Sequence, residues 1–149
     1  MCGDHDSRAS LGGALAVLSS SSSRTSTTPI PTAGRLIFHS RKIESSMATH
    51  AIFTADPSHE TQLVTLEPCL VRIHETGDLT RPLTTSPSWA TFSLKPAIGE
   101  LKDQRWSMEV ELDRPMKIEV GVDGIIGRRV SVWTQQGAGP VAEGIVGYN

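Results

Sequence analysis

Aromatic residues are scarce in this sequence, and its first third has almost none. Three Phe, three Trp and one Tyr occur in 149 residues. Residues 1–46 contain a single aromatic residue, Phe38, together with eleven Ser and four Thr. Ordering a residue costs about 1–2 kcal/mol, which the burial of apolar side chains must offset. The sequence therefore predicts a disordered extension over residues 1–46 and a folded domain in the remaining ~100 residues.

Cysteine and long apolar runs are also rare. The two cysteines are Cys2, in the predicted extension, and Cys69. They indicate no disulfide framework, and Cys69 is best interpreted as a small buried apolar residue. No apolar run approaches the ~20 residues that a membrane-spanning helix needs, so membrane insertion is not expected.

The chain lacks the positive charge that nucleic acids and anionic membranes attract. Its formal net charge is −2, with 14 basic and 16 acidic residues. Residues 47–149 are the acidic part, because basic residues outnumber acidic ones only in the predicted extension. The pairs Arg41-Lys42 and Arg128-Arg129 are too small to reverse this balance. Nucleic-acid binding is therefore not expected.

Motifs for metal, cofactor or catalytic chemistry are missing too. The histidines have no HxH, HxxxH or CxxC neighbours that would indicate a zinc site. No GxSxG, phosphate-binding loop or GxGxxG occurs. Cys69 and His74 are separated by an odd number of positions, so a regular strand sends their side chains to opposite faces. The sequence thus favours a protein that is not an enzyme, with no catalytic residue, metal or cofactor.

The Ser-, Thr- and Arg-rich extension has three interpretations. Residues 7–43 contain no acid, as in an organellar transit peptide, although the opening MCGDHD carries two acids. Alternatively, translation starts at Met47, and residues 1–46 are an upstream artefact or a leader. The third interpretation is a functional tail. A cytoplasmic location is favoured unless the segment is a transit peptide.

A regular pattern occupies residues 105–124, RWSMEVELDRPMKIEVGVDG. Apolar and polar residues alternate with a period of two, are interrupted at Asp113-Arg114-Pro115, and then alternate again. Proline cannot donate to a strand ladder, so we expect a turn there. The pattern predicts an antiparallel hairpin of residues 106–112 and 116–122, extended to a meander by residues 129–134. The core side of this hairpin would hold Trp106, Met108, Val110, Leu112, Met116, Ile118, Val120 and Val122.

Further strands are predicted upstream. Residues 62–66 and 69–75 are separated by Pro68, and residues 89–94 form another run; one helical turn is possible at 98–103. Residues 135–149 are glycine-rich and are expected to form a flexible tail or an edge strand. Five to seven short strands over residues 47–134 predict an all-β fold, a small antiparallel β-sandwich or barrel.

The outer side of the predicted hairpin carries five acids. Facing carboxylates on neighbouring strands can bind Ca²⁺ or act as the acid pair of a glycosidase. The alternative is a solvated sheet face, in which Lys117 faces one of the acids. This candidate acidic face comprises Glu109, Glu111, Asp113, Glu119 and Asp123.

Two tryptophans are candidate ligand-binding residues. Trp89 lies on the opposite strand face from Phe92, and Trp133 lies opposite Val130 and Val132. If these faces are solvated, the indole rings are exposed and can stack on sugars or partner surfaces. If the sheet is covered on both sides, both rings belong to the core.

Three functions follow in order of preference. The first is a non-catalytic structural or protein-interaction module, a subunit of a larger assembly formed with a protein partner or by self-association. The second is a carbohydrate- or small-ligand-binding β-sandwich that uses Trp89 or Trp133. The third is a small hydrolase that uses the strand carboxylates.

Overall fold

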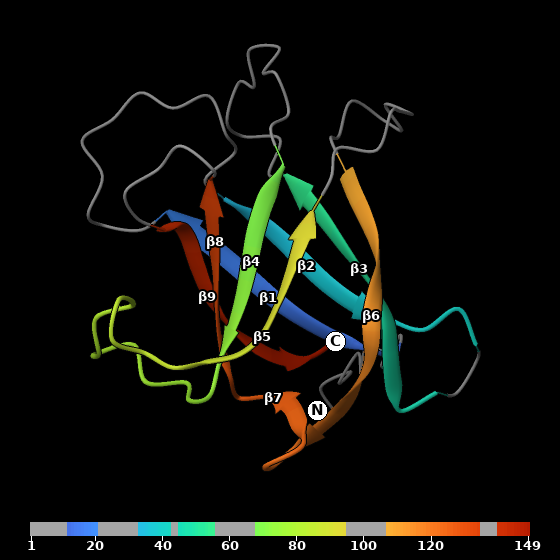
Figure 1. Cartoon of the computed structure of the whole chain (residues 1–149). Coiled ribbons are helices and arrows are strands. Elements are labelled where there is room, and N and C mark those ends of the chain that lie inside the picture. Colours follow the sequence, from blue (N-terminus) through green and yellow to red (C-terminus); the bar gives the residue numbers. More distant parts are fainter. Residues whose placement is uncertain (1–11, 21–32, 43–44, 56–67, 95–106, 135–139) are drawn as a thin grey trace, which may run out of the picture.

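The computed structural model describes residues 12–20, 33–42, 45–55, 68–94, 107–134 and 140–149, which form nine strands (Figure 1). Within these ranges, no helix is long and apolar enough to span a membrane. The strands are β1 (Ala14–Ser20), β2 (Gly34–His39), β3 (Met47–Ala55), β4 (Cys69–His74), β5 (Ser88–Leu94), β6 (Ser107–Val120), β7 (Gly124–Ile126), β8 (Arg129–Thr134) and β9 (Pro140–Tyr148).

All nine strands belong to one sheet, in the order β5-β4-β8-β9-β1-β2-β3-β6-β7. Neighbouring strands are antiparallel except β6 and β7, which are parallel. The sheet bends so that β4 and β5 lie in front of β1 and β2 (Figure 1). This confirms the predicted all-β, sandwich- or barrel-like class, with more strands than predicted and with the sheet left open between β5 and β7.

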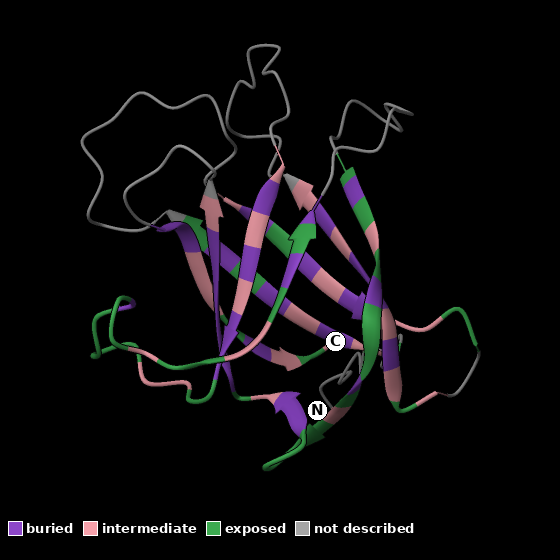
Figure 2. Ribbon diagram, in the orientation of Figure 1, coloured by how far each residue is buried: buried purple, intermediate pink, exposed green. Residues whose placement is uncertain are grey.

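The core fills the space between the two sides of the bent sheet. In strands such as β1, β2 and β6 alternate residues are buried, which gives the banded strands of Figure 2. Phe38 of β2 and Phe92 of β5 meet edge to face across the interior, with ring centroids 6.1 Å apart. Ala14 and Ala16 of β1 leave room for larger side chains opposite them. Hydrophobic burial between distant strands therefore holds the bent sheet together.

Residues 1–46 are not a disordered extension throughout, so that prediction is wrong for two segments. β1 and β2 are interior strands, with β1 paired to β9 and β2, and β2 paired to β1 and β3. Their inward side chains are fully or almost fully buried: Ala14, Ala16, Leu18, Leu36 and Phe38. Four of these five side chains are small or aliphatic, and they suffice because each strand is hydrogen-bonded to a neighbouring strand on both edges. Residues 1–11 and 21–32 lie outside the described residues.

The C-terminal segment is neither a flexible tail nor an edge strand where it is described. β9 lies between β8 and β1, inside the sheet. Gly144 is required by close packing, since a Cβ there would lie 2.3 Å from the carbonyl oxygen of Val17. Gly144, one of the glycines that suggested a loop, thus permits tight strand packing.

The predicted hairpin at Asp113–Pro115 is also wrong. β6 is one continuous strand that pairs with β3 along both halves. Ala48 pairs with Met116 and His50 with Glu111, so four residues of β6 oppose Thr49 alone. A β-bulge interrupts the alternation and tolerates proline as a turn does, which explains the misinterpretation.

Three predicted strands are confirmed as β4, β5 and β8. The meander is wrong because β8 pairs with β4 and β9 rather than with the 106–122 segment. β3 and β7 were not predicted. Residues 62–66 and 98–103, as well as Trp106, lie outside the described residues.

Candidate functional site

The sheet is open where β5 and β6 approach each other without pairing, a line that we call the seam. Each of these strands carries a bulge at the seam. In β5, Ile73 pairs with Ala90 and His74 with Ser88, which leaves Trp89 as the additional residue. In β6, the bulge contains Arg114. Because bulges redirect side chains, these two bulges determine which side chains lie along the seam.

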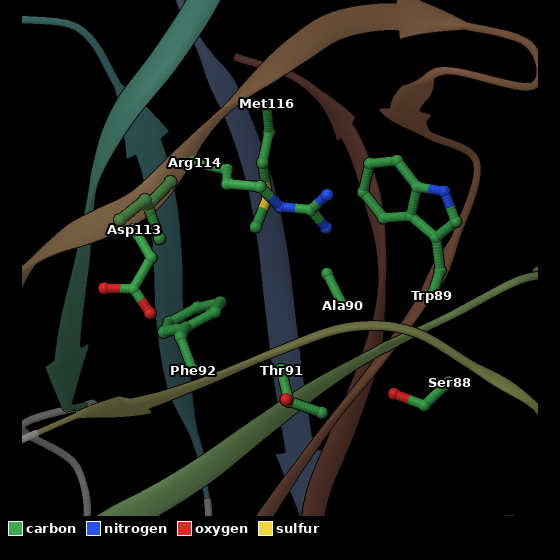
Figure 3. Close-up of a pocket in the computed structure, with 9 residues that line it drawn as sticks. Ser88, Trp89, Ala90, Thr91, Phe92, Asp113, Arg114 and Met116 are labelled. Carbon is green, nitrogen blue, oxygen red and sulfur yellow. The ribbon is translucent and has the colours of Figure 1, made fainter.

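A cavity of about 320 Å³ lies between the two bulges (Figure 3). We call it the seam cavity. Four large apolar side chains line it together with Ala90 and four polar residues. The apolar group is Trp89, Phe92, Leu112 and Met116, and the polar group is Ser88, Thr91, Asp113 and Arg114.

Arg114 supplies the positive charge of the seam cavity. Its side chain is exposed and extends from β6 towards Trp89 (Figure 3). Within the described part of the chain, no carboxylate lies within 4.0 Å of its guanidinium. The neighbouring Asp113 carboxylate is directed away from Trp89 (Figure 3). The cavity therefore contains a cation and an acid that point in different directions.

Trp89 is held in place by Arg128. The guanidinium carbon of Arg128 lies 4.3 Å from the centre of the indole ring, a cation–π contact. Arg128 is only 8% exposed, because its guanidinium is enclosed by backbone carbonyls. It donates hydrogen bonds to the carbonyl oxygens of Gly124 (2.6 Å), Val122 (2.6 Å), Glu75 (2.7 Å) and Gly121 (3.3 Å). Arg128 thus holds the indole ring of Trp89 in its place in the cavity wall.

A second, more open hollow of about 600 Å³ lies beside the seam cavity, and we call it the side groove. Trp89 and Arg128 line it along with Glu75 and exposed Val122. Trp89 is common to both hollows, whereas Arg128 lines the side groove alone. The indole ring therefore separates the two.

Trp133, the other predicted ligand-binding residue, lies elsewhere. It is half-buried and lines neither hollow. Its indole Nε1 donates a hydrogen bond to Ser131 Oγ (2.8 Å), and Arg72 lies over its ring at 4.6 Å. Of the two tryptophans, Trp89 lines both of the hollows described above and Trp133 lines neither.

Ser131 and His74 form a hydrogen-bonded pair that the sequence did not suggest. His74 Nδ1 lies 3.3 Å from the Ser86 carbonyl oxygen, which only accepts, so Nδ1 carries the proton. Nε2 then accepts the Ser131 hydroxyl proton at 2.7 Å. Burial lowers the pKa of His74, and the Arg129 and Arg72 charges act in the same direction.

This pair has the spacing of a nucleophile and its base, but no substrate can approach it. Both side chains are fully buried. Ser131 Oγ also accepts from Trp133. Beside it, Arg129 forms a buried ion pair with Glu143 and donates to the carbonyls of Asp78 and Arg81. The cluster fastens residues 75–87 to the sheet. Cys69 faces the core, opposite His74, as expected.

The five predicted acids do not gather into one site. Because the hairpin is absent, they are spread along β6 and the following turn. Glu111 is exposed and pairs in register with His50, and Asp113 alone lines the seam cavity. Lys117 lies 3.7 Å from Glu119 and 3.9 Å from Asp123. This arrangement resembles the solvated face more than a pair of catalytic acids.

Two histidines adjoin the acidic face. His39 and His50 are paired across β2 and β3, with ring centroids 5.5 Å apart. His39 Nε2 lies 3.6 Å from Glu109 Oε1, which is also 3.7 Å from Arg41. The described residues include no group of three or more His, Cys, Asp or Glu that is placed to hold a metal ion.

No protein-family model matches the chain, and no curated protein matches it in sequence. The seam cavity and its side chains are therefore the features from which a function can be inferred. The sequence identified Trp89 and Asp113 among these as candidate residues but not Arg114, which it placed in a turn. The only signal for Arg114 was the break in alternation beside Pro115.

Proposed function

We propose that the protein is a non-catalytic binding protein that takes a small, partly apolar ligand in the seam cavity. The observation that carries this proposal is a cavity formed by two opposed bulges, with Trp89 on one side and Arg114 on the other. Of the three functions predicted from the sequence, this develops the second.

The lining of the cavity supports ligand binding. Small-molecule sites are concave, mainly apolar and equipped with a few polar groups, over about 300–1,000 Å³. The seam cavity lies at the lower end of this range of volumes. Its exposed surface is more polar than apolar, and Trp89, Phe92 and Met116 contribute to the apolar part. Arg128 already holds Trp89, so the ring loses little conformational freedom when a ligand binds.

Hydrolysis finds less support. A glycosidase needs two carboxyl groups on either side of the scissile bond, about 5–10 Å apart. In the described part of the chain, Asp113 is the single acid that lines the seam cavity. The Ser131–His74 pair lines neither hollow.

A pair of variants on β5 tests the proposal. Ala90 lines the cavity, whereas Ser93 is exposed on the same strand and does not. We expect calorimetric titration with a panel of small aromatic and aliphatic compounds to detect binders of the native protein. Ala90→Phe should abolish their binding by filling the cavity, and Ser93→Phe should retain it. Binding that survives in Ala90→Phe would place the ligand elsewhere and refute the proposal.

A second candidate, the interaction module, is favoured by one observation. Among the described strands, β5 pairs with β4 alone, and its sequence SWATFSL has neither charge nor proline. Such an edge accepts an additional strand from a partner or a second copy. Light scattering tests self-association: Thr91→Lys should convert an oligomer to a monomer, and a native protein that is monomeric at every concentration argues against pairing between copies.

A further inference from the structure

We propose that the seam cavity selects monoanionic ligands, namely small carboxylates with one apolar ring or a short apolar chain. The carboxylate would pair with Arg114, and the apolar part would lie against Trp89, Phe92 and Met116. This inference rests on the proposed binding function and adds the chemical class of the ligand.

The charge of the cavity is the first argument. Arg114 is exposed, and none of the described carboxylates is within ion-pair distance of it. The other nearby cation, Arg128, already donates to four backbone carbonyls and does not line the cavity. Arg114 is therefore the cation in the described lining that a ligand can neutralise.

The shape of the cation is the second argument. The guanidinium group is planar and presents parallel N–H donors that match the two oxygens of a carboxylate. Asp113, next to Arg114, also lines the cavity and repels further negative charge. One cation beside one acid favours a ligand of charge −1 over a phosphate monoester, which approaches −2 at neutral pH.

The apolar wall is the third argument. Trp89, Phe92 and Met116 provide aromatic and thioether surfaces, which pack well against a ring. Figure 3 shows Arg114 extending towards Trp89 across this wall. A ligand with its ring on the wall and its carboxylate at Arg114 would use both features at once.

A matched pair of probes tests the inference. 3-Phenylpropionate and 3-phenylpropanamide have the same ring and chain but differ in charge. By calorimetry at low salt, we expect the native protein to bind the carboxylate at least about tenfold more tightly than the amide. Arg114→Gln should remove this difference and leave amide binding unchanged. Arg114→Lys should retain part of it, because the charge remains but the planar pair of donors is lost.

Arg81→Gln is the control, since Arg81 is an exposed arginine that pairs with Asp78 and does not line the cavity. This variant should bind both probes as the native protein does. Equal binding of amide and carboxylate by the native protein, or full preference in Arg114→Gln, overturns the charge selection while leaving the proposed function standing. If neither probe nor any neutral compound of the panel binds, the proposed function itself fails.

Discussion

At the scale of single residues, two arginines near Trp89 differ in what surrounds them. Arg128 is buried and donates to four carbonyls, so its charge is satisfied within the fold. Arg114 is exposed and borders the seam cavity. We therefore assign structure to the first and ligand recognition to the second.

Replacing each arginine by methionine separates these roles. Arg128→Met removes four hydrogen bonds, among them the buried one to the Gly124 carbonyl, and should lower the free energy of unfolding by about 3 kcal/mol. Arg114→Met should change it by less than about 0.5 kcal/mol, as an exposed substitution does. Urea unfolding followed by circular dichroism measures both. Similar losses in the two variants would contradict the assignment.

His74 makes stability depend on pH. Its lowered pKa means that the folded protein holds the neutral imidazole, whereas the unfolded chain protonates near pH 6.5. Stability is therefore complete above about pH 6.5 and falls as the pH drops towards the folded-state pKa. We expect the urea midpoint to decrease from pH 7 to pH 5.5, and His74→Asn to show a smaller decrease over that range. A native midpoint that is constant there would rule out this coupling.

At the scale of elements, the strands that alternation reveals are those with one clear apolar side. β4 carries apolar residues at every second position, and β5 does so towards its end, at Ala90, Phe92 and Leu94, so the limits of both strands follow from the sequence to within a residue or two. The inward side of β1 consists of two alanines and one leucine, and the strand is followed by a run of serines, so its apolar pattern is weak. In β9, a glycine that close packing requires, Gly144, interrupts the apolar pattern. These strands depend on their neighbours, which a single sequence does not identify.

Two adjacent residues of β1 test its place in the sheet. Ala16 points inward and is 0% exposed, whereas Val17 points outward and is 64% exposed. Ala16→Glu buries a charge and should cost at least about 3 kcal/mol of stability, while Val17→Glu should cost less than about 0.5 kcal/mol. Denaturant unfolding of both variants gives the comparison. If the two substitutions are equally neutral, β1 is not an interior strand.

The bulges explain why the site itself was only half predicted. Trp89 was noted for its place on an outer strand face, but the bulge in β5 directs it to the cavity. Arg114 appeared to belong to a turn, because a turn and a bulge both tolerate proline and both interrupt the alternation of apolar residues. The sequence shows the chemical type of each residue, but the strand order decides that Trp89 and Arg114 line the same cavity.

At the scale of the whole molecule, an open sheet has a consequence that a closed barrel lacks. Bending brings β5 and β6 together without pairing, so the sheet is left open along one line. The cavity lies on that line, with core residues Phe92 and Leu112 in its wall. Binding at the seam would therefore couple directly to the packing of the core.

The position of bound ligand tests the central claim most directly. In a ¹H–¹⁵N correlation spectrum of the full chain titrated with 3-phenylpropionate, the indole signal of Trp89 and the amides of residues 88–92, 112–114 and 116 should shift. The indole signal of Trp133, which lies outside both hollows, should stay unchanged. Trp89→Phe assigns the signal. Shifts confined to Trp133 and its neighbours, or no shifts at all, would contradict binding at the seam.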